Sequence, residues 1–427
     1  MREVAAHGDP TGKRIHPDMT RGTATCIPEN PPDAWLARRF RVAWGFLLVS
    51  VLIGLGLRLQ WVWPWTSLDY NDLMHAHSHV AFLGWVFNAF FVAALRYFVP
   101  AAETRGYDRL WWTMQLGVAG MLVTFPFQGY AAASIAFSTL HMAAAFVFAV
   151  KLWRRNRAAP AARVHLRLAL AFMLLSGAGP LALGVLPALG LRESPAYTLA
   201  IYFYLHCQYN GWFPFFLQAL LLQRAQEQGW RVNDTAATGA AWWLGIGGLL
   251  AFALSTLWCE PAAVVGWIAV AGGVMQAVGA GRFVRAVRGL PWPADRVVRV
   301  LAFVALGAWL LKHGLHLVGP VPGLAVLAQQ RFVAIAFLHL VFLGLVTPGV
   351  LVWAHAQGWL PANGRFCAGT VLLLLGTVFS ELLLVVPTLA GGLPFGWSLP
   401  LPLLIASAVL VAGVALLLPG GPDSRKA

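Results

Sequence analysis

The chain has 427 residues, of which 59% are hydrophobic and only 11% are charged. A soluble globular protein carries about 25% charged residues, so this composition excludes an ordinary water-soluble domain. The formal net charge is +14, but the basic residues lie in short loops between apolar runs, which argues against a nucleic-acid-binding surface. The four cysteines show no CxxC spacing, so neither a disulfide framework nor a zinc site is expected.

Apolar runs of roughly 20 residues recur along the chain, and each is long enough to cross a hydrocarbon core about 30 Å thick. Lipid cannot satisfy backbone polar groups, so runs of this length predict helices. We therefore predict an all-α polytopic membrane bundle of about twelve transmembrane helices. The expected spans are 42–62, 76–98, 110–128, 131–153, 166–188, 197–222, 239–258, 261–282, 299–319, 329–354, 366–388 and 397–418.

The predicted organisation is a disordered cytoplasmic tail (1–38), one transmembrane domain (39–420) and a cytoplasmic C-terminus (421–427). With these spans, 26 of the 30 Lys and Arg residues fall in the tail, in alternate loops and at the C-terminus. The positive-inside rule then places both termini in the cytoplasm. We expect the chain to lie in the lipid bilayer of a bacterial inner membrane. The four basic residues outside the pattern are Arg58, Arg192, Lys312 and Arg331.

Histidines are the most informative polar residues, because ionisable side chains in a membrane are costly and mark functional sites. Four of the twelve are set aside: two in the tail, His165 in a cytoplasmic loop and His355 at the inner end of its span. At 1.5 Å rise per residue, the others all lie between the midplane and the outer surface. These eight are His75, His77, His79, His141, His206, His313, His316 and His339.

The spacing of these histidines indicates which helix faces they share. His75 and His79 are four residues apart and share a face, whereas His77 points the opposite way, so this helix serves two neighbours. His313 and His316 share a face in the same manner. A single membrane histidine more often forms a helix–helix hydrogen bond than a metal bond. Eight at one level favour a metal or heme site, because neutral imidazole is the commonest metal ligand.

Two further patterns involve these spans. Residues 79–84 (HVAFLG) and 339–344 (HLVFLG) match, and both copies enter the membrane from the same face. Glu381 lies at a depth similar to that of Lys312, so it is expected either to carry protons or balance the charge of a metal, or to pair with Lys312.

Three stretches resemble the heme–copper oxidase and nitric oxide reductase large-subunit superfamily and the related NnrS-like membrane proteins. Residues 70–79 (YNDLMHAHSH) are similar to the helix whose histidine ligates a low-spin heme, and the offset from Asn71 favours His77 over His79. Residues 204–213 (YLHCQYNGWF) are similar to the copper-binding helix. Residues 337–344 (FLHLVFLG) are similar to the helix with two heme-ligating histidines, although Phe337 occupies the first position here.

The resemblance implies a fold like that of the heme–copper oxidase large subunit, with heme and a candidate copper as cofactors. The span 239–258 lacks the histidines that the family uses for copper, and His313 and His316 are the candidates to replace them. The implied cofactor-binding residues are His75, His77, His79 and His339, and the implied metal ligands are His206, His141, His313 and His316.

The expected function is that of an integral membrane heme protein of oxidoreductase type, with no catalytic residue assigned. It would handle a small diatomic or redox ligand such as nitric oxide or oxygen, with electrons from quinol or a partner subunit. One alternative is a histidine-lined metal-ion or proton transporter, which Gly177, Pro180 and Pro214 inside spans would suit. Another is a non-enzymatic heme sensor or an assembly factor.

Overall fold

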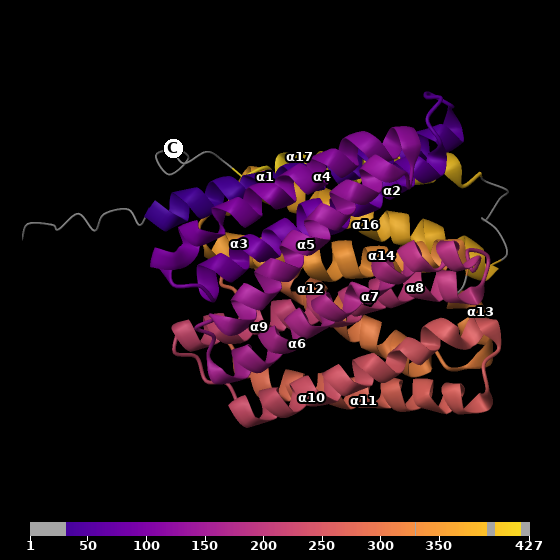
Figure 1. Ribbon diagram of the computed structural model, residues 1–427. Coiled ribbons are helices and arrows are strands. Elements are labelled where there is room, and N and C mark those ends of the chain that lie inside the picture. Colours follow the sequence, from indigo (N-terminus) through magenta and orange to yellow (C-terminus); the bar gives the residue numbers. More distant parts are fainter. Residues whose placement is uncertain (1–30, 329, 391–397, 420–427) are drawn as a thin grey trace, which may run out of the picture.

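The computed structural model describes residues 31–328, 330–390 and 398–419. Within these residues every regular element is a helix and no strand occurs, which confirms the all-α prediction. The helices run side by side in one bundle (Figure 1). Such an architecture is expected where each segment must satisfy its own backbone polar groups.

The helices of the first half of the chain include two short 3₁₀ segments, η2 and η3, and two π-helical segments, η1 and η4. In chain order they are α1 (Pro31–Val62), α2 (Tyr70–His79), η1 (Val80–Phe87), α3 (Asn88–Tyr97), η2 (Ala101–Tyr107), α4 (Asp108–Gln128), α5 (Ala132–Arg154), α6 (Pro160–Ser176), α7 (Ala178–Val185), η3 (Pro187–Leu189), α8 (Pro195–His206), η4 (Cys207–Trp212) and α9 (Phe213–Glu227).

The second half contains one 3₁₀ segment, η5, and one π-helical segment, η6. Its helices are α10 (Asp234–Leu250), η5 (Ala251–Cys259), α11 (Ala263–Val287), α12 (Arg296–Val318), α13 (Pro322–Ala328), α14 (Arg331–His339), η6 (Leu340–Val346), α15 (Thr347–Ala356), α16 (Gly364–Ala390) and α17 (Pro400–Leu416).

Ten helical segments in the described part of the chain are long and apolar enough to cross a membrane. They overlap ten of the predicted spans, so the chain has the helices of a multi-pass membrane protein. The segments are Asp33–Val62, Tyr70–Tyr97, Ala101–Gln128, Ala132–Arg154, Pro160–Leu189, Asp234–Cys259, Ala263–Val287, Arg296–Val318, Arg331–Ala356 and Gly364–Ala390.

The two remaining predicted spans also fall on helices. The span 197–222 lies within the unbroken helical run of α8, η4 and α9, and the span 397–418 contains α17, an apolar helix of 17 residues. A total of twelve spans stays a prediction. At the N-terminal side, α1 begins at Pro31, inside the predicted tail of 1–38, while 1–30 and the C-terminal 421–427 lie outside the described residues.

His165 lies inside α6, so its placement in a loop is wrong. Pro160 starts this helix, and the fixed φ of proline suits the first helical position. The His165 ring is fully buried and hydrogen-bonds the Gln218 side chain at 2.8 Å and the Ala237 carbonyl oxygen at 3.1 Å. These bonds tie α6 to α9 and α10, so this histidine joins helices.

Three helical runs form the centre of the bundle: α2–η1–α3, α8–η4–α9 and α14–η6–α15. Their phenylalanine rings meet, with centroid distances of 5.8 Å for Phe82–Phe213, 4.5 Å for Phe82–Phe342 and 5.4 Å for Phe213–Phe342. In the first and third runs, 78% and 56% of the most apolar 18 residues are buried, against 33–44% in the other candidate spans. The remaining helices therefore surround this trio.

A π-helical segment begins directly after a histidine in each central run. His79 precedes η1, His206 precedes η4 and His339 precedes η6, and these are the π-helical segments of the described residues. The matching stretches at 79–84 and 339–344 thus share local structure. Such segments are rare and frequently occur at functional sites.

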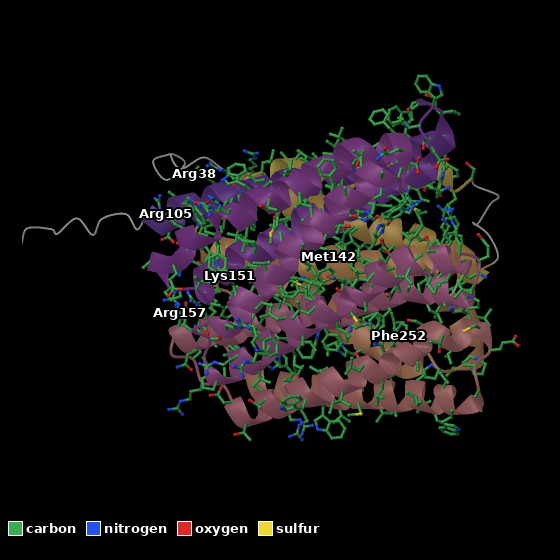
Figure 2. The ribbon with its side chains drawn as sticks, in the orientation of Figure 1. Arg38, Arg105, Met142, Lys151, Arg157 and Phe252 are labelled. Atoms are coloured by element: carbon green, nitrogen blue, oxygen red, sulfur yellow. The ribbon has the colours of Figure 1, made fainter. Side chains whose placement is uncertain are left out.

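The two ends of the bundle differ in charge. Figure 2 shows Arg38, Arg105, Lys151 and Arg157 gathered at the end where α1 begins. Val414, near the end of α17, accepts a hydrogen bond from Trp44 of α1 at 3.1 Å, so the first and last described helices meet toward this end. The positive-inside rule assigns this end to the cytoplasm, and that sidedness stays a prediction.

Candidate functional site

The eight intramembrane histidines divide into three groups, each between different helices. All eight lie at similar depth along their helices. Their side chains point in different directions around the helix axes, and this separates them into groups. The groups are His77 with His339, then His206 with His313 and His316, and finally His75 and His79 with His141.

His77 is held by α1. Its Nδ1 donates a hydrogen bond to the Ser50 carbonyl oxygen at 2.8 Å. The same helix comes close at Gly54, where an added Cβ would lie 3.1 Å from the His77 Cε1 atom. A neutral imidazole that donates through Nδ1 carries its lone pair on Nε2. The Nε2 atom of His77 therefore remains free to bind a metal.

His339, the last residue of α14, is held by α16. Its Nδ1 lies 2.9 Å from Glu381 Oε1, and an ionised carboxylate only accepts, so the ring donates. When it is neutral, this imidazole presents Nε2 with its lone pair, as His77 does. Among the described residues neither Nε2 atom has a hydrogen-bond partner.

These groups belong to one site, which we call the His77–His339 site: Arg58, His77, His339 and Glu381. His77 interacts electrostatically with His339 and with Arg58, and Arg58 interacts with Glu381. The four side chains come from α1, α2, α14 and α16. Helix bundles build cofactor sites from inward side chains on facing helices in this way.

The second group lies between α8, which ends at His206, and α12, which carries His313 and His316. The His206 and His316 rings are nearly parallel, with centroids 6.5 Å apart. His206 uses both ring nitrogens, because Nε2 donates to the Gly248 carbonyl oxygen at 2.7 Å and Nδ1 accepts from Asn210 Nδ2 at 2.9 Å. In this arrangement His206 has no nitrogen left for a metal. His206, His313 and His316 do lie together, as the sequence analysis expects.

Lys312 also lies in the second group. Its side chain is fully buried, and Nζ has no hydrogen-bond partner in the described part of the chain. It interacts electrostatically with His206, His313 and His316. The expected pairing of Lys312 with Glu381 is wrong, because the carboxylate bonds His339. When Lys312 is protonated, its charge disfavours a divalent cation between these histidines.

Phe337 of α14 packs against the second group. Its ring stacks on His316 with centroids 5.8 Å apart and contacts Tyr209 at 5.4 Å. It therefore faces the second group, whereas His339, two residues later, faces Glu381.

The third group lies between α2, α4 and α5. His79 Nδ1 donates to the His75 carbonyl oxygen at 2.8 Å, and its Nε2 accepts from Tyr130 Oη at 3.4 Å. His75 packs against Tyr130 with ring centroids 4.6 Å apart. His141 interacts electrostatically with His79, and its Nε2 has no partner among the described residues. The residues expected to bind one cofactor are therefore divided, because His75 and His79 lie on a different face of α2 from His77.

Within the described residues, no group of three or more His, Cys, Asp or Glu side chains is arranged to hold a metal ion. A heme needs fewer protein ligands, because two imidazole nitrogens suffice to hold its iron. The residues that the sequence did not assign to a site are Ser50 and Arg58. The sequence did single out Arg58, because it is one of the four basic residues outside the alternation of charged loops.

Comparison with known proteins adds no family: neither a protein-family model nor a curated protein matches the sequence.

Proposed function

We propose that the chain is a membrane heme protein in which His77 and His339 would hold the heme iron. The observation that carries the proposal is the anchoring of both rings through Nδ1, which leaves both Nε2 lone pairs unused. Metal-ligating histidines characteristically donate their other N–H to a carbonyl or carboxylate, which fixes the tautomer and the ring orientation. Ser50 and Glu381 are these acceptors.

A heme supplies one-electron chemistry when bound, and the protein sets its ligation, polarity and access. Two histidine ligands would leave the iron without an open position. The site thus favours the redox part of the expected function, with quinol or a partner subunit as electron donor. Binding of nitric oxide or oxygen at this site would require one histidine to leave.

Copper does not enter this proposal. His206 has both nitrogens engaged, and the Lys312 side chain lies next to His313 and His316 without a hydrogen-bond partner in the described part of the chain. Imidazoles bind copper through a free nitrogen, which His206 lacks in this arrangement. A copper site in this group stays a prediction.

Substitution of the two ligands tests the proposal. We expect His77→Ala and His339→Ala each to lose the reduced-minus-oxidised heme bands and most of the bound iron, since each removes one axial nitrogen. The measurement is an absorption spectrum with iron analysis on detergent-purified protein. His355→Ala, at the other end of the same helical run as His339, is the control and should retain both. Wild-type spectra and iron in both ligand variants would rule out this assignment.

A further inference from the structure

The two proposed ligands are held by acceptors of different charge. His77 donates to a neutral carbonyl oxygen, whereas His339 donates to a carboxylate oxygen. Hydrogen bonds to an ionised acceptor are roughly twice as strong as neutral ones. The carboxylate therefore draws the Nδ1 proton of His339 more strongly, which raises the basicity of Nε2 toward a metal.

Arg58 provides the opposite charge at the same site. It is only 8% exposed, and its guanidinium lies 4.8 Å from the Trp61 ring centroid. Among the described residues its Nη1 is buried without a hydrogen-bond partner. A guanidinium stays protonated in proteins, so Arg58 is a fixed positive charge that interacts electrostatically with His77 and with Glu381.

We propose that Glu381 and Arg58 are positioning residues that set the reduction potential of the heme in opposite directions. This inference rests on the proposed heme ligation. Ferric heme carries one more positive charge than ferrous heme, so a nearby carboxylate stabilises the ferric form and lowers the potential. A nearby guanidinium disfavours the ferric form and raises it. Both effects are stronger inside a membrane than in water, because the dielectric constant is low.

Redox titration of purified wild-type protein and three variants tests the inference. Glu381→Gln keeps the shape and removes the charge, so we expect the equilibrium constant for heme reduction to rise at least tenfold, which is 59 mV for one electron. Arg58→Gln should lower the same constant at least tenfold. Glu193→Gln removes a carboxylate from an exposed loop and should leave the potential unchanged.

The signs of the two shifts decide the result. Heme-loaded Glu381→Gln and Arg58→Gln proteins with unchanged potentials, or with shifts in the same direction, would overturn the inference and leave heme ligation intact. If Glu381→Gln does not fold, Arg58→Lys, which keeps the charge, should resemble wild type while Arg58→Gln does not; equal potentials in those two variants would also overturn it. Wild-type protein without heme would overturn both the ligation and the inference.

Discussion

Gly54 controls how closely α1 approaches His77. A Cβ at this position would lie 3.1 Å from the His77 ring, and the branched side chain of valine would displace that ring further. We expect Gly54→Val to lower the heme content of the purified protein at least tenfold. Gly45→Val is the matched control, since it lies in the same helix with nothing within 4 Å of its added Cβ. Equal heme content in the two variants would show that His77 needs no fixed ring position.

Single residues of the site were only partly predictable from sequence. His77 was favoured over His79 by its offset from Asn71, and the structure separates these two histidines onto different helix faces. For Glu381 the similar depth left two alternatives, a role in carrying protons or balancing the charge of a metal, or a pair with Lys312. Depth comes from counting residues along a helix, but partner choice depends on rotation about the helix axis and on which helices are neighbours. Sequence alone does not supply either.

Element-scale features were predictable where they follow helical periodicity. Four-residue spacing predicted a shared face for His75 and His79, and both contact Tyr130 while His77 contacts α1, which confirms it. The repeat at 79–84 and 339–344 was visible in the sequence, but no sequence signal indicated the π-helical segments that follow the two histidines.

The contact between α10–η5 and α11 depends on a small residue at 272. A Cβ on Gly272 would lie 2.5 Å from the Ala251 backbone nitrogen, a distance that forces the helices apart. Close helix approach in membranes uses such residues. We expect Gly272→Val to lower the stability of the protein by about 1–3 kcal/mol, the usual cost of overpacking. Thermal unfolding in detergent measures this.

Gly266→Val serves as the control for that variant. It lies in the same helix, α11, with nothing within 4 Å of its added Cβ. Replacing glycine by valine changes the helix propensity by a similar amount at both positions, so the difference between the two unfolding midpoints isolates the interhelical contact. Equal midpoints would mean that α11 can shift without cost.

The molecule as a whole follows from its apolar runs, since ten of the predicted spans are long apolar helices. Their arrangement did not follow, because apolar periodicity tells which segments cross lipid but not which helices meet. The trio of Phe82, Phe213 and Phe342 places three runs at the centre, and the histidine groups lie between these runs and the surrounding helices. The histidines that the sequence places at one depth therefore form three separate groups in the structure.

Heme binding by the wild-type chain is the central claim, and one measurement tests it most directly. Protein produced under heme-replete conditions and purified in detergent is examined by reduced-minus-oxidised and carbon monoxide difference spectra, with iron analysis of the same sample. We predict a Soret band, stoichiometric iron and no carbon monoxide shift, because two histidines fill the axial positions. Protein without heme or iron would contradict the account and favour a histidine-lined transporter.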